Sequence, residues 1–497
     1  MNKKFYITTA IPYVNARPHI GHALEFIQAD VIARYHRLKG EEVLLLSGSD
    51  ENALKNVQAA QSAGVPVQQF IDENAVLFVE LANALGVQFD VFQKGSSKEH
   101  HLSSQKLWQL CAENGDIYKK SYEGLYCTGC EAFYTPDELD ANQECLEHPG
   151  RKLESVSEEN YFFKLSRYQD KIISVLESDE LEIVPATRKN EMLAFLKQTL
   201  QDISISRTNE RAKNWGVPVP ADDSQRMYVW FDALNMYQSG VGFGLDEQKH
   251  NKWWPADIHV IGKGIIRFHA VYWPAFLLSA GLPLPKKIFV HGYITSSGQK
   301  MSKTLGNVVD PFPLVEKYGS GAVRYFFLRE IPPTEDGDFS YEKFEERYNS
   351  DLASGLGNLV ARVLALVGKI NPKSFDKLRI PSEVEGQIQS PKLREIINAA
   401  REKVDTALEK FQFQDALIAI WDVIHFCDRY IEEKKPWSFD FAQDKPDQKE
   451  VIDDLLLAIL AIGTLLKPFL PATSEKIANQ LQHGKGDPLF PRLDRNV

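Results

Sequence analysis

The sequence lacks the features that mark membrane-spanning and exported proteins. No apolar run among its 497 residues approaches the roughly 20 that a helix needs to cross a bilayer. The first residues pass from Lys3 and Lys4 into a short apolar run, with no hydrophobic leader and no cleavage site. Hydrophobic residues make up 43% and charged residues 25%, as in an ordinary globular protein. We therefore expect a cytoplasmic location.

An excess of positive charge is also missing. The chain has 57 Lys and Arg residues against 68 Asp and Glu residues, so its formal net charge is −11. Proteins that bind nucleic acid neutralise phosphates with basic side chains, so an acidic average argues mildly against such a partner. A basic stripe can still lie on an acidic protein. Composition therefore neither predicts nor excludes an RNA partner.

Internal repeats are absent as well, and the length exceeds what one hydrophobic core supports, so we expect two to four domains. Residues 1–115 alternate between strand-like and helix-like segments, which predicts a doubly wound parallel sheet. Over 116–205 this alternation of strand-like and helix-like segments is interrupted, as by a small inserted domain, and it then resumes. After about residue 345, long segments with a 3.6-residue period predict a bundle. The expected fold is a split, Rossmann-like α/β domain with an insertion, followed by an all-α helical bundle.

Individual elements follow from the hydrophobic pattern. Buried parallel strands are expected in four short apolar runs: 5–11, 40–48, 257–262 and 288–294. Helices are expected where apolar residues recur every 3.6 positions: 23–38, 52–63, 352–367, 392–411, 414–434 and 449–466. The polar, turn-rich stretch 438–448 is expected to be a surface loop.

Two short motifs lie beside predicted strands. PHIGH (18–22) follows the run 5–11, and KMSKT (300–304) follows the run 288–294. A strand that leads through a glycine turn into a helix makes a phosphate site, because the helix N-terminus offers N–H groups and a positive dipole end. Histidines there and lysines on a distant loop can surround a polyphosphate from two sides.

Each motif also has a plain structural interpretation. The histidines could cap a helix, and the lysines could belong to a solvated surface loop. For either motif alone, this interpretation is as good as the functional one. The occurrence of both, in this order and each beside a strand, favours the phosphate site.

With these two motifs the chain resembles the class I aminoacyl-tRNA synthetases, whose motifs are HIGH and KMSKS. The resemblance is strongest to the methionine-specific family and includes AIPY (10–13), YVWFDA (228–233) and the run 259–274. It implies a methionine–tRNA ligase, which forms methionyl-adenylate from methionine and ATP, releases pyrophosphate, and charges the 2′-OH of the terminal adenosine of tRNA. The implied partners are ATP with Mg²⁺, L-methionine and tRNA(Met).

The resemblance also implies roles in the nucleotide site. Negative charge builds on phosphorus as pyrophosphate departs, so donors and positive side chains are what the chemistry needs. Gly21 would let adenine stack on bare backbone, and Gly298 and Gly306 suggest a loop that closes over ATP. The implied catalytic residues are His19, His22, Lys300 and Lys303. The implied ATP-binding residues are His19, Gly21, His22, Gly262, Lys300, Met301, Ser302 and Lys303.

For the amino acid, the resemblance implies an apolar, aromatic-lined pocket, which suits a flexible thioether. An isolated Trp or Tyr is more often ordinary core packing, and only the family brings these positions together. The ammonium group of the substrate would pair with Asp50 and with the carbonyl of Ile11. The implied methionine-binding residues are Ile11, Tyr13, Asp50, Trp230, Ala233, Leu234, Tyr237, Ile265 and His269.

Three departures from the family pattern lie near this site. Asn52-Ala53 stand where His-Gly is usual, Gly264 stands where an Asp is common, and Leu234 replaces a frequent Pro. The first two changes remove polar groups near the expected adenylate, so we expect redistributed contacts and an unchanged reaction.

Three of the five cysteines lie close together in the sequence with one histidine. Cys127 and Cys130 form one pair, and Cys145 and His148 form a second. This spacing suits one tetrahedral Zn²⁺ with four protein ligands, which leaves no open position and implies a structural site. A disulfide is the alternative, and a reducing cytoplasm disfavours it.

Three residues of the helical region complete the implied site. Asn358 and Arg362 lie four residues apart and so share a helix face. Trp437 alone would be a packing or capping residue. The resemblance implies that all three read the CAU anticodon, the Trp by stacking on a splayed base. Asp428 stands where an Asn is common in the family. A separate expectation concerns assembly: no further module follows the bundle, so we expect a monomer.

With these assignments the chain divides into five segments, two of which are halves of one catalytic domain. They are 1–115, the first catalytic half; 116–205, a connective domain with the zinc knuckle; 206–320, the second catalytic half; 321–350, a stem-contact linker; and 351–497, a helical anticodon-binding domain.

Other functions stay open. A class I ligase for leucine, isoleucine or valine usually carries an editing insertion larger than 116–205, and a cysteine enzyme would hold zinc in its substrate pocket. A non-catalytic tRNA-binding protein derived from a synthetase would not need both motifs, and a small-molecule nucleotidyltransferase would not need the bundle. ATP–pyrophosphate exchange with each amino acid separates these candidates.

Overall fold

The computed structural model describes residues 3–127, 132–134, 139–145, 150, 152–301, 307–370, 388–437 and 448–493. The chain folds as two compact units. Unit 1 contains Met1–Pro18, His36–Asn83 and Gln88–His291, and unit 2 contains His19–Tyr35, Ala84–Val87 and Gly292–Val497. The domain boundaries expected from the sequence stay predictions.

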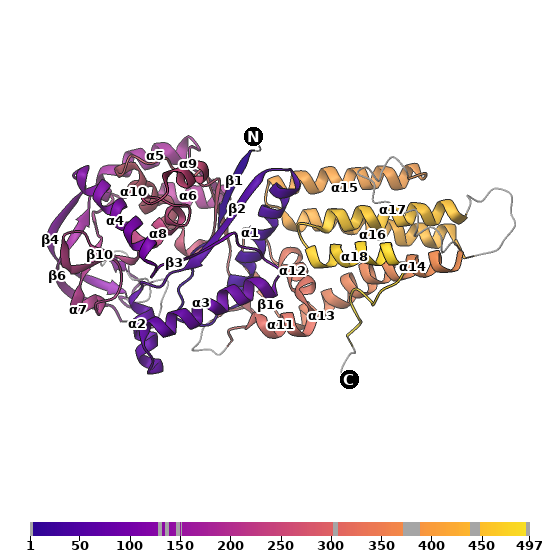
Figure 1. The fold of residues 1–497 in the computed structure, drawn as a ribbon, viewed down its shortest axis with the longest axis horizontal. Helices are drawn as coiled ribbons and strands as arrows, with labels where there is room; N and C mark the ends of the chain where they lie inside the picture. The colour runs from indigo at the N-terminus through magenta and orange to yellow at the C-terminus, as the bar shows by residue number, and fades with distance from the viewer. Residues whose placement is uncertain are drawn as a thin grey trace. The chain divides into compact units, whose positions relative to one another are not determined.

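Unit 1 is built on a six-stranded sheet with the order β3-β2-β1-β12-β13-β7, and every neighbouring pair is parallel. Figure 1 shows β1, β2 and β3 of this sheet as indigo arrows. Beside β1 the order reverses, because β2 and β3 continue to one side while β12 and β13 lie on the other. Ligands of such sheets bind beyond the carboxyl ends of the strands at this reversal. The strands are β1 (Lys4–Thr8), β2 (Glu42–Ser49), β3 (Val91–Lys94), β7 (Glu182–Val184), β12 (Ile258–Gly262) and β13 (Lys287–His291).

Hydrophobic runs bury the middle of this sheet, as the sequence predicts for parallel strands. Leu45 and Leu46 of β2 and Phe289 of β13 are fully buried. Helices α4, α8 and α10 pack against one another in the same unit. The helices of unit 1 include α2 (Leu54–Ala63), α3 (Val67–Ala84), α4 (Lys98–Glu113), α5 (Gln169–Glu177), α6 (Ala186–Phe195), α7 (Asn209–Ala212), α8 (Val229–Ser239), α9 (Glu247–Trp253) and α10 (Trp273–Ser279).

Two smaller antiparallel sheets belong to unit 1. The first has the order β5-β4-β6-β8, from β4 (Ile117–Cys127), β5 (Ala132–Tyr134), β6 (Glu154–Phe163) and β8 (Ile203–Ser204). The second has the order β10-β11-β9, from β9 (Ser206–Thr208), β10 (Pro218–Val219) and β11 (Asp222–Met227). β7 comes from the expected insertion but pairs with β13 in the main sheet.

The single strand expected over 288–294 is wrong. The run divides at Gly292 into β13 of unit 1 and β14 (Ile294–Ser296) of unit 2. A Cβ atom at Gly292 would lie 2.1 Å from the carbonyl oxygen of Glu335, so only glycine fits this close approach of two backbones. β14 then pairs with β15 (Gln299–Lys300) and β16 (Gly337–Phe339) in a separate three-stranded sheet.

Unit 2 is mostly helical. Figure 1 shows α15, α16, α17 and α18 running side by side, and each contacts the next. The four helices expected after about residue 345 are present, the first of them beginning within a π-helical segment, η5 (Tyr348–Gly357), whereas α18 was not expected. The helices are α1 (Ile20–Leu38, which continues into unit 1), α11 (Pro311–Tyr318), α12 (Ser320–Arg329), α13 (Tyr341–Arg347), α14 (Asn358–Ile370), α15 (Pro391–Glu409), α16 (Phe413–Lys434), α17 (Gln448–Leu466) and α18 (Pro471–His483).

One continuous helical stretch is long and apolar enough, by length and composition alone, to cross a membrane. It spans 28 residues, Tyr341–Gly368, and includes a π-helical segment, η5 (Tyr348–Gly357). The most apolar part of this stretch is 56% buried inside the protein. Such burial is typical of a core helix.

A buried ion pair anchors α1 within unit 2. The guanidinium of Arg324 lies 2.7 Å from the carboxylate of Asp30, and their side chains are 1% and 0% exposed. Arg324 also donates to the carbonyl oxygens of Phe469 and Pro468, at 2.6 and 3.1 Å. These contacts hold the charge in place between α1, α12 and the turn before α18.

Candidate active site

Three predicted residues of unit 1 follow the carboxyl ends of adjacent strands. Ile11 comes after β1, Asp50 directly after β2, and Gly262 ends β12. Tyr13 and Asp50 form an isolated parallel bridge, and the N–H of Asp50 donates to the carbonyl of Pro12 at 2.8 Å. Asp50 is only 4% exposed. The reversal point of the sheet therefore carries a buried carboxylate.

An aromatic cluster lies around Trp230 of α8. Its ring stacks on Phe268 at a centroid distance of 3.7 Å and an interplanar angle of 5°. Tyr13 and His269 each meet the indole edge-on, both at 6.3 Å. The indole Nε1 is buried and has no hydrogen-bond partner among the described residues. These contacts form an apolar wall of flat side chains.

The polar end of this cluster is a neutral histidine. His269 Nδ1 lies 2.9 Å from the carbonyl oxygen of Ile265, which can only accept, so Nδ1 carries the proton. Nε2 must then accept from the hydroxyl of Tyr237, 2.7 Å away. Burial lowers the pKa of His269 to about 4, and the contact with the Ile265 carbonyl opposes this only partly. The ring is therefore uncharged at neutral pH.

All nine residues predicted for methionine binding lie in unit 1, and several contact one another. Tyr13, Trp230, Tyr237, Ile265 and His269 are linked by the contacts above. Ala233 and Leu234 are buried on α8 between Trp230 and Tyr237. Phe268 was missed, although it lies in the quoted run 259–274 and directly precedes His269.

The contacts of Asn52 explain one departure from the family pattern. Its side-chain amide donates to Asp232 at 2.5 Å and to the carbonyl of Gly95 at 2.8 Å. Asp232 is 2% exposed and lies 3.4 Å from Nε2 of His100. Asn52 thus supplies a donor to a buried carboxylate. Gly264 lies in a single 3₁₀ turn, η3 (Lys263–Ile265), directly after β12.

In unit 2, the HIGH motif forms the first turn of α1. Nδ1 of His19 accepts from the N–H of Gly21 at 3.0 Å, and Nδ1 of His22 accepts from the N–H of His19 at 3.1 Å. An accepting Nδ1 bears no proton, so in the neutral ring Nε2 carries it. The two rings lie 4.0 Å apart. The turn therefore presents two imidazole N–H donors at a helix N-terminus, where anions are favoured.

The lysine motif is in the same unit, and only part of it is described. Ser302 and Lys303 lie outside the described residues, as does the side chain of Lys300. The backbone of Lys300 pairs with Thr295 in the β14–β15 hairpin. The N–H of Ile20 donates to the carbonyl of Val309 at 3.2 Å. The start of the HIGH helix therefore contacts the segment that follows the lysine motif.

Two of the four expected zinc ligands are described. Cys127 and Cys145 are 3% and 1% exposed, and Sγ of Cys145 lies 3.5 Å from the hydroxyl of Tyr134. Cys130 and His148 lie outside the described residues. Within the described ranges, no group of three or more His, Cys, Asp or Glu side chains could hold a metal.

The three anticodon candidates lie on or beside α14 and α16 of unit 2. Arg362 is held by two carboxylates of α16, at 2.5 Å from Glu432 and 3.6 Å from Asp428. Burial raises the pKa of Asp428, and Arg362 opposes the rise. Asn358 is exposed, and the side chain of Trp437 is 45% exposed.

Comparison with known proteins agrees with these features. The family model "tRNA synthetases class I (M)" matches residues 5–364, and "Anticodon-binding domain of tRNA ligase" matches residues 392–490. The methionine–tRNA ligase of Rhizobium meliloti is 43% identical over 95% of this chain and 90% of its own length. The methionine–tRNA ligase of Brucella suis is 40% identical over 96% of this chain and 92% of its own length.

A solved structure is similar over nearly the whole chain. Mycobacterium tuberculosis methionyl-tRNA synthetase in complex with methionyl-adenylate has a TM-score of 0.89 and 37% identity, and the match covers 99% of this chain and 100% of that one. The chain belongs to the class I tRNA synthetases, on the methionyl-tRNA synthetase branch.

Proposed function

We infer that this chain is a methionine–tRNA ligase. It joins methionine to ATP as methionyl-adenylate, releases pyrophosphate, and transfers the aminoacyl group to the 2′-OH of the terminal adenosine of tRNA(Met). The aromatic cluster around Trp230 carries this conclusion, because it gives the family assignment a set of side chains with matching chemistry.

The cluster suits a thioether side chain. Polarisable sulfur makes favourable contacts with aromatic rings, and here Tyr13, Trp230 and Phe268 supply them. The Tyr237–His269 pair is neutral and satisfied within itself, so it offers little to a charged substrate. Asp50, buried beside β1, would balance the ammonium group together with the Ile11 carbonyl.

For activation, the residues of unit 2 would supply donors and positive charge. The carboxylate of methionine attacks the α-phosphorus, and the departing pyrophosphate carries away charge that must be stabilised. The Nε2–H groups of His19 and His22 would donate to phosphate oxygens, and Lys300 and Lys303 would hold the β and γ phosphates. Gly21, Gly262, Met301 and Ser302 would complete the nucleotide site.

The proposal includes two metal ions. Mg²⁺ would accompany ATP and neutralise its phosphates. One structural Zn²⁺ would be held by Cys127, Cys130, Cys145 and His148. The two described cysteines are buried in the expected connective region, as thiolate ligands of a closed site are. Metal analysis of the purified protein tests this, with one zinc per chain as the expected result.

For tRNA, the proposal assigns the anticodon to Asn358, Arg362 and Trp437. The exposed indole of Trp437 offers a stacking platform for an unpaired base. Arg362 is pre-positioned by Glu432 and Asp428. A cytoplasmic location and a monomeric state belong to the same proposal, and light scattering with size-exclusion chromatography tests the second.

ATP–pyrophosphate exchange tests the proposed function. Methionine should support exchange, whereas leucine, isoleucine, valine and cysteine should not. Tyr237→Phe removes the donor to His269 and should raise KM for methionine about tenfold, with a smaller change in kcat. Tyr118→Phe is the matched control, because its hydroxyl bonds Asp202 in the antiparallel insertion. Exchange with another amino acid, or none with methionine, contradicts the proposal.

A further inference from the structure

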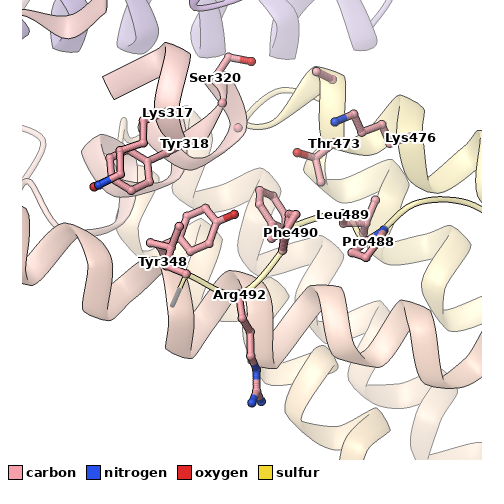
Figure 2. Close-up of a pocket in the computed structure, with 15 residues that line it drawn as sticks. Lys317, Tyr318, Ser320, Tyr348, Thr473, Lys476, Pro488, Leu489, Phe490 and Arg492 are labelled. Atoms are coloured by element: carbon pink, nitrogen blue, oxygen red, sulfur yellow. The ribbon is translucent and has the colours of Figure 1, made fainter. Parts of the chain in front are cut away.

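A pocket of about 430 Å³ in unit 2 has no role in the function proposed above. It lies where the α11–α12 junction meets the start of α18 and the segment 488–493 (Figure 2). Tyr348 and Phe490 form an apolar side of it, while Ser320 and Thr473 contribute hydroxyl groups.

Two helices begin at this pocket. α12 has 10 residues and starts at Ser320, and α18 has 13 residues and starts at Pro471. The first helical hydrogen bonds are made by the N–H groups of Val323 and Ser474, to Gly319 and Leu470. The earlier N–H groups of each helix have no acceptor in their own helix, and both positive dipole ends face the same space.

Thr473 is a second and independent sign of a ligand. It is only 5% exposed, and its hydroxyl has no hydrogen-bond partner among the described residues. Figure 2 shows its oxygen directed into the pocket, toward α12. A Cβ atom at position 321 would lie 2.7 Å from this oxygen, so Gly321 keeps the space around the hydroxyl open. The hydroxyl therefore lies at the wall of the pocket, where it can donate to or accept from a ligand.

The residues that line the pocket are basic or uncharged. Lys317, Lys476 and Arg492 line it, and none of the described lining residues is acidic, although the whole chain has a net charge of −11. Lys317 pairs with Glu345 at 3.2 Å, and Arg492 donates to Ser354 at 3.3 Å. Lys476 makes no ion pair with any described residue. It is therefore the cation most available to a ligand.

We propose that this pocket binds a phosphate group, and that the group belongs to the backbone of the bound tRNA. Two helix N-termini, a buried hydroxyl and a lysine together match the donors that hold phosphate oxygens. RNA is favoured over a free anion because the anticodon-binding match, 392–490, includes Thr473 and Lys476. The tRNA source rests on the proposed function.

Two variants and two matched controls test the proposal. Lys476→Gln removes the available cation, and Lys392→Gln removes the same charge from an exposed site on α15. Ser320→Asp adds a carboxylate that favours the first turn of α12 but repels phosphate, and the melting temperature of this variant checks that it is folded. Ser340→Asp makes the same change at the N-cap of α13, outside the pocket.

The measurement is the dissociation constant of a tRNA(Met) transcript over a series of salt concentrations. Lys476→Gln should weaken binding about fivefold and lower the salt slope by about 0.7–1, as expected for one lost phosphate contact. Ser320→Asp should weaken binding at least as much, while both controls bind like wild type. Equal losses in variants and controls, or no loss in either variant, overturn the proposal.

A second measurement separates the two phosphate sources. The melting temperature of the full chain is compared in phosphate and in chloride at equal ionic strength, for wild type and Ser320→Asp. If Ser320→Asp binds tRNA normally but loses the phosphate-induced rise in melting temperature, the tRNA backbone is not the source of the phosphate. Wild-type exchange with methionine is run in parallel, so that failure of the proposed function is seen separately.

Discussion

Lowering the pH from neutral to 5 should destabilise unit 1 through His269. Burial lowers the pKa of this ring to about 4, whereas an unfolded histidine titrates near 6.5. As the pH falls below 6.5, the ring becomes protonated in the unfolded chain but stays neutral in the folded protein. The contribution of the neutral ring is therefore complete above pH 6.5 and is lost progressively as the pH falls toward 4.

The magnitude follows from these two pKa values. At pH 5 the unfolded ring is almost fully protonated and the folded ring almost fully neutral, so His269 alone costs about 2 kcal/mol relative to neutral pH. His259 adds to the same trend, because burial lowers its pKa well below the ordinary value. The effect should be specific to the buried rings and absent once they are replaced.

Urea unfolding at pH 7.5 and pH 5, followed by tryptophan fluorescence, measures the effect. Six of the eight tryptophans lie in unit 1, so the signal reports mainly on that unit. His269→Gln keeps a donor and an acceptor but does not titrate, and its loss between the two pH values should be about 2 kcal/mol smaller than that of wild type. Equal losses, or NMR titration of His269 near 6.5, would refute the reasoning.

Three further predictions concern unit 2. Asp30→Asn should lower the unfolding free energy by about 3–5 kcal/mol in urea denaturation, because it leaves the guanidinium of Arg324 buried without its counter-charge, and adding Arg324→Met should restore most of the loss. Lys303→Ala should cost about 3 kcal/mol in pyrophosphate exchange with little change in methionine binding; equal loss in both would contradict the loop's role. Trp437→Ala should weaken tRNA(Met) binding by about 1–3 kcal/mol in filter binding and leave exchange intact, whereas unchanged tRNA affinity would contradict base stacking.

The main elements could be predicted because their signal is local. The apolar run 40–48 is typical of a strand that is buried on both faces, and it forms β2, an interior strand of the parallel sheet. The pattern fails where a distant contact decides. At Gly292, where the strand ends, the backbone of Glu335 comes too close for a side chain. The residues 288–294 alone contain no signal of this distant contact. Helix α18 escaped prediction although Pro471 marks its first turn.

The residues of the aromatic cluster around Trp230 could be predicted only in part. Tyr13, Trp230 and His269 could be named because a family resemblance brought distant strand ends together. Phe268 stacks on Trp230 at 3.7 Å, yet its spacing within 259–274 is that of any buried helical aromatic. Likewise, the bond from Asn52 to Asp232 joins residues 180 positions apart, so no local pattern contains it. Contacts of this kind depend on the folded geometry.

The two interpretations of the HIGH histidines are compatible. His19 and His22 do cap the first turn of α1, since Nδ1 of each accepts a backbone N–H. Capping in this way fixes the tautomer, and the fixed tautomer places the remaining proton on Nε2. The same contact that makes the residues look structural thus prepares them as phosphate donors. Replacing either by Asn or Gln, which cap and donate with different reach, should preserve α1 and slow activation in pyrophosphate exchange; unchanged rates with a fully folded helix would show that the capping role is the whole role.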